Sequence, residues 1–508
     1  MSETKMPEDE ASIIERMDVF FKPKSVAVVG ASRGAGKAGH VIFRNFVDNK
    51  RRGLFRGELY PVNPNEDSIL GYRCYPSLPE VVGDVELVVV VVPARVVPGI
   101  MEDAAKKGVK AAAIISSGFG EVGEGELEAR VKAIAQSAGI RVLGPNCLGV
   151  YDSYTGVDML FLPETKTLSV GNVVIATPRP MPGSVAIVTQ SGAFGVAAID
   201  YLAGHEIGVS RLVSFGNKID VAEPEMLLYL LHDRETRVIL LYVEGIEDGR
   251  RFIDVAEKVT KHKPVVALKT GRSKAGARAA LSHTGAIAGT DRIYDGLFKQ
   301  VGVLRAGNME EFFDMARALA LQPPAEGNSI GILTDAGGPG IMAVDECEAR
   351  GLDVKRFSDE TIRRFEDLKG EGKIPSFATN YNPVDLTGAV TSDMFEQAAE
   401  ILLEDPEIHG IIVLGLHHTP ALQEDYPDRI ARLSKAHTKP VVACDIGETE
   451  MAMYIRSRFT KLRIPAYSSP EDAARSMAVL ANYGAYLRKR GRFDEYLRSY
   501  LEWVGSQA

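Results

Sequence analysis

The chain has 508 residues, which at about 150 residues per domain suggests three domains. An apolar content of 45% with 25% charged residues is ordinary for a soluble globular protein. The net charge of −9 argues against non-specific binding to nucleic acid, whose phosphates would be repelled.

The sequence also argues against a membrane or secreted protein. Its longest apolar run, Leu87–Pro93, is much shorter than the ~20 residues that span a bilayer. The first residues, MSETKMPEDEAS, are polar and acidic, unlike a signal peptide. Four widely spaced cysteines without a CxxC motif favour free thiols over disulfides or a zinc site: Cys74, Cys147, Cys347 and Cys444. We therefore expect a cytoplasmic protein without a metal site of its own.

The first 150 residues alternate short β-branched runs with segments of helical length. The expected strands are Ser25–Val29, Glu58–Val62, Leu87–Val92, Ala111–Ile115 and Arg141–Leu143. Continuous apolar runs such as LVVVVV are typical of parallel strands that are buried on both faces. The pattern predicts a doubly wound, Rossmann-like α/β domain.

A literal GxGxxG, Gly34 to Gly39, follows the first expected strand and suggests a dinucleotide site. Two features disagree with NAD. The first strand already ends at Gly30, so the pattern starts late, and the second strand ends at Asn63 rather than at an acid that would bind the ribose hydroxyls. Coenzyme A, another phosphate-bearing nucleotide, fits these residues better, and an NAD-dependent oxidoreductase is disfavoured.

The rest of the chain contains an internal repeat. Residues 184–195, SVAIVTQSGAFG, match residues 329–340, SIGILTDAGGPG. A second match pairs 264–267 and Gly271 with 440–443 and Gly447. Two copies of one α/β domain are therefore expected, with the Pro-rich segment 322–327 as a linker between them.

Each copy begins with a strand, a glycine-rich turn and a helix. Such a turn directs several backbone N–H groups to one spot, where the helix dipole adds partial positive charge. Gly192 and Gly195, with Gly337 and Gly340 in the second copy, allow close approach of a ligand. The alternative is a tight turn without a ligand, but two such turns in one chain favour phosphate binding.

A histidine in the first copy is the candidate nucleophile. His283 lies in SHTG, within the segment Gly271–Gly289, whose many small residues favour a mobile loop, with a helix as the alternative because several of them are Ala. Neutral imidazole is a good nucleophile near pH 7 and forms covalent intermediates. Glu244 follows the strand Val238–Val243, at the sheet edge where α/β proteins bind ligands, and could orient the ring. The alternatives are a structural histidine and a helix-capping or surface glutamate.

The second copy differs at these positions. Phe459 stands near the place of His283, and Leu416 stands where the first copy has Glu244. His417 and His418 follow a strand of the second copy, and without a small-residue loop around them we interpret them as structural or substrate-lining.

Several motifs together carry a family resemblance. They are SVAVVGAS (25–32), YPVNP (60–64), GPNCLGV (144–150), QSGAFG (190–195), SFGNKIDV (214–221), YVEG (242–245), SHTGAIAG (282–289), TDAGGPG (334–340) and NPVDLTG (382–388). On these motifs the chain, from about residue 20 to its end, resembles the α subunits of the ADP-forming acyl-CoA synthetases, relatives of succinyl-CoA synthetase. The resemblance implies a CoA-binding domain at 1–150 and two flavodoxin-like ligase-CoA domains, 151–322 and 323–508.

The resemblance also implies roles for individual residues. It makes His283 the phosphohistidine and Glu244 the residue that steadies it. The phosphate-binding residues would be Ser191, Gly192 and Ala193, with Gly337 and Gly338 in the second copy. The CoA-binding residues would be Gly30, Ala31, Ser32, Gly34, Gly36, Asn63, Pro93, Ser116, Ser117 and Asn146.

The implied reaction is acyl-CoA + ADP + phosphate ⇌ carboxylic acid + ATP + CoA, through an acyl phosphate and a phosphohistidine. The 508 residues are taken up by the three domains, so we expect an ATP-grasp β subunit to bind ADP or ATP with Mg²⁺, in an α2β2 assembly. The alternative function is a non-catalytic CoA-sensing or scaffold protein, against which the presence of both His283 and Glu244 argues.

The chain departs from the family pattern in two places. It has Asp335 where the family usually has Asn, and a carboxylate is electrostatically unfavourable beside a phosphate. The stretch Lys166–Pro182 is longer than usual, and a lid, a contact loop or a simple insertion would each explain it.

Overall fold

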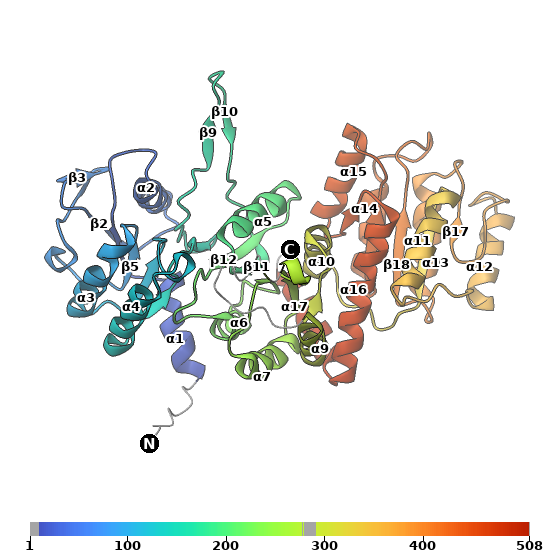
Figure 1. Ribbon diagram of the computed structural model, residues 1–508. Helices are drawn as coiled ribbons and strands as arrows, with labels where there is room; N and C mark the ends of the chain where they lie inside the picture. Colours follow the sequence, from blue (N-terminus) through green and yellow to red (C-terminus); the bar gives the residue numbers. More distant parts are fainter. Residues whose placement is uncertain (1–9, 277, 279–290, 507–508) are drawn as a thin grey trace. The chain divides into compact units, whose positions relative to one another are not determined.

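Three mainly parallel β-sheets form the framework of residues 10–276, 278 and 291–506, which the computed structural model describes (Figure 1). The chain divides into two compact units, Met1–Arg305 and Ala306–Ala508. The first unit contains two of the sheets and the second unit contains the third. The expected α/β class is confirmed.

The first sheet is doubly wound, with five parallel strands in the order β2-β1-β5-β6-β7. Its strands are β1 (Ser25–Val29), β2 (Glu58–Val62), β5 (Leu87–Val90), β6 (Ala111–Ile114) and β7 (Arg141–Leu143). Its helices are α1 (Glu10–Phe21), α2 (Ala38–Arg51), α3 (Val97–Lys107) and α4 (Gly125–Ala138), and β3 (Ser68–Ile69) pairs with β4 (Tyr72–Arg73) as a small hairpin. The apolar runs of β1 and β5 are buried throughout, as parallel central strands require.

The second sheet has the order β15-β14-β13-β11-β12-β8, and β8 alone is antiparallel to its neighbour. Its strands are β8 (Gly149–Asp152), β11 (Pro182–Thr189), β12 (Val209–Ser214), β13 (Val238–Val243), β14 (Val265–Lys269) and β15 (Leu304–Arg305). Its helices are α5 (Gly192–Gly204), α6 (Glu223–His232), α7 (Gly249–Thr260) and α9 (Asp291–Val301). Apolar side chains of both sheets belong to one continuous core in the first unit.

The long stretch before the first repeat forms a projecting hairpin. Strands β9 (Thr165–Thr167) and β10 (Val173–Ile175) pair antiparallel and extend from the first unit (Figure 1). Val170, Val173 and Ile175 are 67–75% exposed. Apolar side chains that are this exposed on a two-stranded hairpin are unusual for a free surface.

The second unit has a five-stranded parallel sheet in the order β17-β16-β18-β19-β20. The strands are β16 (Ile330–Thr334), β17 (Val384–Asp385), β18 (Gly410–Leu414), β19 (Val441–Cys444) and β20 (Ala466–Tyr467). The helices are α10 (Met309–Leu321), α11 (Gly337–Ala349), α12 (Asp359–Gly370), α13 (Ser392–Glu404), α14 (Tyr426–Ala436), α15 (Glu450–Lys461), α16 (Pro470–Lys489) and α17 (Phe493–Ser506). Helix α16 packs on α10 and α11.

The internal repeat is visible in the strand register. Val185 of β11 is opposite Val238 of β13, and the equivalent residue Ile330 of β16 is opposite Gly410 of β18. Counting along these strands places Leu416 where the first copy has Glu244, as expected from the sequence.

The segment 322–327, predicted as a linker between the two copies, is packed against the second unit at Gln322. Gln322 is buried in the second unit, where its Oε1 accepts a hydrogen bond from Val441 N (2.8 Å) and its Nε2 donates to Arg463 O (2.6 Å). Pro and Gly mark a turn in the chain, but their presence does not determine whether the turn is exposed. The boundaries at 150 and 322 stay predictions.

Candidate functional site

The turn between β11 and α5 is closed by its own side chains. Thr189 Oγ1 accepts a hydrogen bond from Ser191 N (3.0 Å) and donates to Ser191 O (2.9 Å). Ser191 Oγ then caps the helix by accepting from Phe194 N (3.3 Å). Ser191 and Gly192 are half-buried and Ala193 is exposed. The first turn of α5 is therefore accessible at the carboxyl end of β11, as an anion site requires.

Glu244 is held beside this turn by Gln190. Gln190 Oε1 accepts hydrogen bonds from the backbone N–H groups of Glu244 and Gly245, the latter at 3.0 Å, and its Nε2 donates to Gly245 O (2.9 Å). One amide thus joins the turn after β11 to the turn after β13. Glu244 itself is 6% exposed. Burial raises the pKa of the neighbouring Tyr242, and the carboxylate of Glu244, which is hydrogen-bonded to Tyr242, raises it further.

Two lysines that were not predicted as site residues lie at the same edge. Lys269 ends β14, is 2% exposed, and its Nζ lies 4.7 Å from the centroid of the Tyr294 ring. Burial lowers the pKa of Lys269. Lys218 Nζ donates to Gly245 O (2.8 Å) and pairs with Glu223 (3.0 Å). A lysine that closes a buried strand directly before a glycine-rich segment was the signal in the sequence for Lys269.

His283 lies outside the described residues. Its predicted pairing with Glu244 therefore stays a prediction, whereas the position of Glu244 at the carboxyl end of a central strand is observed.

The Gly30–Ser32 turn, expected to bind CoA, is preformed. Gly30 has a φ of 95°, and a Cβ added to it would lie 2.2 Å from Val91 O. Asn63 Nδ2 donates to Ala31 O (2.7 Å), and Ser32 Oγ accepts from Gly34 N (3.1 Å). Helix α2 follows with no acidic residue in its first turn, so the helix dipole is not neutralised there.

The glycines of the literal GxGxxG do not all pack tightly. A Cβ on Gly36 would contact nothing within 4 Å, and one on Gly34 would touch only the Lys37 side chain. Gly39 is different, because its added Cβ would lie 2.0 Å from Gly30 O. The glycine that lets helix α2 approach the first strand is therefore Gly39, the last of the pattern.

The other predicted CoA residues gather at the same sheet edge. Asn63, Pro93 and Asn146 follow β2, β5 and β7, and Ser116 and Ser117 follow β6. Ser116 links two of these segments, since its Oγ accepts from Val92 N (3.1 Å) and its backbone O accepts from Asn146 N (2.9 Å). The structure thus brings together at one edge the segments that the sequence proposed separately.

In the second repeat a carboxylate takes the place of the Gln190 amide that joins the two turns. Asp335, at the position of Gln190, accepts hydrogen bonds from Leu416 N (3.1 Å) and Thr419 Oγ1 (2.7 Å). Burial raises the pKa of Asp335 to about 6. A Cβ on Gly337 would lie 2.9 Å from Asp385 Oδ2, whereas Gly338 faces open space. Two acids therefore lie near the first turn of α11, and one of them, Asp335, stands where the first copy has the neutral Gln190.

His417 is fully engaged by its neighbours. Its Nδ1 lies 2.5 Å from Oδ1 of the completely buried Asp445, and its Nε2 lies 3.1 Å from Thr449 Oγ1. The His418 ring packs against the His417 ring, with centroids 3.9 Å apart. Both ring nitrogens of His417 are hydrogen-bonded, which agrees with a structural role.

Metal-binding groups, membrane-spanning helices and cysteine thiols also bear on the class of site. Among the described residues, no group of three or more His, Cys, Asp or Glu side chains is arranged to hold a metal ion. Across that same part of the chain, helices of the length and apolarity needed to span a membrane are absent. All four cysteines are free thiols, as the sequence predicted, and all four are buried.

Comparison with known proteins identifies the family. Family models match a CoA binding domain at residues 24–153, a succinyl-CoA ligase like flavodoxin domain at 182–319 and a ligase-CoA domain at 330–493. The chain is 38% identical over 482 residues to acetate–CoA ligase (ADP-forming) I subunit alpha of Pyrococcus furiosus, covering 93% of this chain and 99% of that protein. The chain belongs to the ADP-forming acetate–CoA ligase family.

Other members of the ligase family differ in length. The acetate–CoA ligase (ADP-forming) of Methanocaldococcus jannaschii is 37% identical over 484 residues, but these are 94% of this chain and 65% of that protein. The chain therefore spans about two thirds of that relative. A solved structure of Ca. Korarchaeum cryptofilum dinucleotide forming acetyl-coenzyme A synthetase 1, in complex with phosphate and ADP, superposes with a TM-score of 0.84 at 36% identity, over 93% of this chain and 98% of that one.

Proposed function

We propose that this chain acts as the α-type subunit of an ADP-forming acyl-CoA synthetase, with the reaction acyl-CoA + ADP + phosphate ⇌ carboxylic acid + ATP + CoA. The observation that carries the proposal is the Gln190 amide, which joins Glu244 to the turn where α5 begins. Membership of the ligase family supports it, and all the relatives named above are ligases or synthetases. The non-catalytic CoA-sensing or scaffold alternative has no such support.

The proposed steps use the first turn of α5 and His283. Phosphate binds at the first turn of α5, at Ser191, Gly192 and Ala193, and one of its oxygens attacks the thioester carbonyl carbon. The C–S bond breaks, the sulfur takes a proton, and an acyl phosphate forms. A ring nitrogen of His283 then attacks phosphorus, so the carboxylate leaves and the phosphoryl group is held by the protein.

Glu244 is proposed as a positioning residue for His283. A buried carboxylate that accepts a hydrogen bond from one ring nitrogen fixes the tautomer and leaves the other nitrogen to attack. It also stabilises the positive charge that develops on the ring. Lys269, buried at the end of the neighbouring strand, would favour the negative charge of the phosphoryl group.

The CoA-binding edge is proposed to consist of the residues at the strand ends of the first sheet. They are Gly30, Ala31, Ser32, Gly34, Gly36, Asn63, Pro93, Ser116, Ser117 and Asn146. The Gly30 turn, where a Cβ has no room, and the uncapped start of α2 suit a phosphate-bearing ligand.

The remaining assignments are also proposals. The domains are 1–150, 151–322 and 323–508, and the protein is cytoplasmic, in keeping with its free thiols.

Gly337 and Gly338 form a second phosphate-binding turn, at which the nearby Asp335 and Asp385 weaken the binding of phosphate. Nucleotide and Mg²⁺ bind to a separate ATP-grasp β subunit in an α2β2 assembly, and the Pyrococcus relative named as an alpha subunit supports such a partner.

A panel of acyl-CoA esters tests the function. The chain and a candidate ATP-grasp subunit are incubated with each ester, ADP and phosphate, and ATP is measured. We expect ATP with at least one ester, and only when ADP and phosphate are both present. No ATP with any ester in the complete mixture would contradict the proposal.

A further inference from the structure

A cavity of about 520 Å³ opens in the first unit, away from the proposed CoA-binding edge. It is lined by residues 21–24, which directly precede β1, by residues 53–57, which directly precede β2, and by residues 154–155, which follow β8. The parallel strands β1 and β2 each span five residues at about 3.3 Å per residue. The cavity therefore lies at the opposite edge of the sheet, about 16 Å from the strand ends that carry Gly30 and Asn63.

Only cations contribute charge to the cavity wall. Lys22, Lys24 and Arg56 line it, with no Asp or Glu, in a chain whose net charge is −9. Lys22 pairs with Asp18 at 2.9 Å.

Neither the ammonium of Lys24 nor the guanidinium of Arg56 lies in an ion pair with a described residue. The Glu86 carboxylate accepts a hydrogen bond from Lys24 N (2.8 Å) and interacts electrostatically with Lys24, but it is itself paired with Lys110 (2.8 Å). Positive charge is therefore available to a ligand here, above all on Arg56.

A second cavity of the first unit provides a contrast. It measures about 640 Å³, and acids line it together with the cations, three acids beside four cations. Arg141 pairs with Asp220 at 2.8 Å, and Arg251 pairs with Glu225 at 2.5 Å. Cationic lining without acids is thus a property of the first cavity and not of both.

The body of the first cavity is apolar. Phe21 and Phe55 are almost fully buried, and Phe55 packs edge-on against Phe46 with ring centroids 5.1 Å apart. Tyr154 and Leu54 are 38% and 44% exposed, so their apolar surface faces solvent at the rim. Ligand pockets typically combine such walls with a few charged groups that fix orientation.

The cavity walls are held in place. A Cβ on Gly57 would lie 2.7 Å from Pro23 O, and one on Gly156 would lie 2.8 Å from Phe55 N, so the backbones here are already in contact. Lys50 Nζ donates to Gly57 O (2.8 Å) and Asn49 Nδ2 donates to Gly156 O (2.9 Å). Helix α2 thus ties two of the lining segments, and the cavity is preformed.

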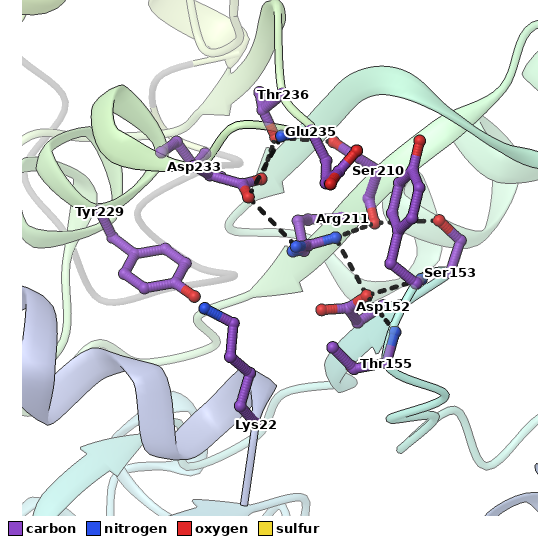
Figure 2. A network of polar contacts seen from close by, with 12 residues as sticks. Lys22, Asp152, Ser153, Thr155, Ser210, Arg211, Tyr229, Asp233, Glu235 and Thr236 are labelled. Atoms are coloured by element: carbon purple, nitrogen blue, oxygen red, sulfur yellow. Dashed lines mark hydrogen bonds and ion pairs between the residues drawn. The ribbon is translucent and has the colours of Figure 1, made fainter. Parts of the chain in front are cut away.

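A network of polar contacts surrounds the buried Arg211 (Figure 2). The Arg211 guanidinium lies 5.9 Å from the Phe21 ring centroid and 5.6 Å from that of Tyr154. Its charge is balanced by Asp152 (3.0 Å) and Asp233 (3.2 Å). Arg211 therefore supports the walls, and an anion in the cavity would be bound by the lining cations instead.

We propose that this cavity binds a small organic anion, with a carboxylate or phosphate head beside Lys24 and Arg56 and an apolar body against Phe21, Phe55 and Tyr154. Guanidinium and ammonium groups bind both kinds of oxyanion through charge-assisted hydrogen bonds. The site is separate from the proposed CoA and phosphate sites and does not depend on the proposed reaction.

Calorimetry on the intact chain tests the proposal with four probes. Phenyl phosphate and phenylacetate carry the two heads on an aromatic body, benzyl alcohol carries the body alone, and inorganic phosphate carries a head alone. We expect one or both aromatic anions to bind with a Kd of about 0.1–10 mM, the range for fragments of this size. They should bind at least about tenfold tighter than either partial probe, and the better anion identifies the head.

Two variants test whether the aromatic anions bind in this cavity. The double substitution Lys24→Glu with Arg56→Glu should weaken binding of the aromatic anions at least about tenfold. Lys132→Glu, at an exposed cation of the other cavity, should leave binding unchanged, and CoA titrations check that both variants are folded. The proposal is overturned if neither aromatic anion saturates, if a partial probe binds equally well, or if the double variant binds like the wild type.

Discussion

Gln190 and Asp335 occupy the same position of the two repeats, and each accepts a backbone hydrogen bond from the turn after the neighbouring strand. The distance is 3.0 Å from Gly245 N to Gln190 Oε1 and 3.1 Å from Leu416 N to Asp335 Oδ1. The first repeat performs this task with a neutral amide and the second with a carboxylate. A negative charge beside a helix N-terminus opposes binding of an anion there, so one shared fold provides two chemically different turns.

The Gln190 amide should be required for catalysis. Gln190→Ala removes its hydrogen bonds to the Glu244–Gly245 turn, which at about 1 kcal/mol each lowers the unfolding free energy by about 2–3 kcal/mol. Glu244 then loses its fixed position, and ATP formation with the partner subunit should slow at least about tenfold. CoA affinity, measured by calorimetry, should not change. A wild-type rate would show that the amide only stabilises the fold.

Gln190→Glu is the matched control. It keeps an oxygen that can accept from Glu244 N and Gly245 N, but it places a carboxylate where the second repeat has Asp335. The variant should therefore fold yet bind phosphate more weakly than the wild type, which isolates the effect of charge from that of the hydrogen bonds.

Asp335 should make stability depend on pH. Burial raises the pKa of Asp335 from 3.8 to about 6, so between these values the folded protein retains a proton that the unfolded chain has released. The favourable contribution of protonated Asp335 to the unfolding free energy is thus fully present below pH 4. It is lost as pH rises to 6 and above, by about 3 kcal/mol at 1.36 kcal/mol per pKa unit. Asp335→Asn removes this dependence.

Chemical denaturation of both proteins between pH 4 and 8 measures the effect. The difference in unfolding free energy, Asn variant minus wild type, should increase from pH 4 to about pH 6 and level off above it. Burial also raises the pKa of the nearby Asp445. Because Asp445 is present in both proteins, its contribution to the pH dependence largely cancels in the difference. A difference that stays constant with pH would show that Asp335 titrates normally.

Much of the fold was predictable because burial leaves a direct pattern in the sequence. Continuous apolar runs marked the parallel strands, and the match between 184–195 and 329–340 predicted the repeated domain. The ends of those strands also placed Glu244 and Asn63 at sheet edges, because side chains after parallel strands share an edge.

The remaining details depend on contacts between distant residues. Gln190 meets Glu244 across 54 positions of the chain, and no local pattern distinguishes that glutamine from an exposed one. The burial of Lys269 likewise depends on Tyr294 from a later helix. Among the GxGxxG glycines, only the packing of α2 on the first strand singles out Gly39. The burial of Gln322 in segment 322–327 depends on distant residues too, Val441 and Arg463.

Gly39 and Gly36 provide a test of the CoA-binding turn. Gly39→Ala puts a Cβ 2.0 Å from Gly30 O, so either the helix or the turn must move. We expect a loss of about 1–3 kcal/mol in unfolding free energy and much weaker CoA binding, measured by denaturation and calorimetry. Gly36→Ala meets nothing within 4 Å and should keep wild-type stability. Equal stability of the two variants would contradict the role assigned to Gly39.

Substitutions of His283 and Glu244 should impair phosphoryl transfer without impairing CoA binding. His283→Ala should abolish both ATP formation and labelling of the protein by radioactive ATP in the presence of the partner, while CoA binding is retained. The wild-type label should be acid-labile and base-stable, as expected of phosphohistidine. Glu244→Gln should slow transfer by about 10- to 1,000-fold without abolishing it. Labelling that persists in His283→Ala would rule out this nucleophile.

The nucleotide should bind outside this chain. The described residues are accounted for by a CoA-binding sheet and two ligase-type sheets, and the Pyrococcus furiosus relative, matched over 99% of its length, is named as an alpha subunit. Purified alone, the chain should bind CoA in calorimetry, should not bind ADP or ATP with useful affinity, and should make no ATP.

Addition of an ATP-grasp subunit should restore turnover, because the phosphoryl group on His283 must reach ADP on the partner without contact with water. An obligate interface of this kind should bury more than about 2,000 Å², so the two subunits should co-elute in size-exclusion chromatography. The control is the His283→Ala chain, which should co-elute equally well yet produce no ATP. Tight ADP binding by the isolated chain, or ATP formation without a second protein, would place the nucleotide site on this chain instead.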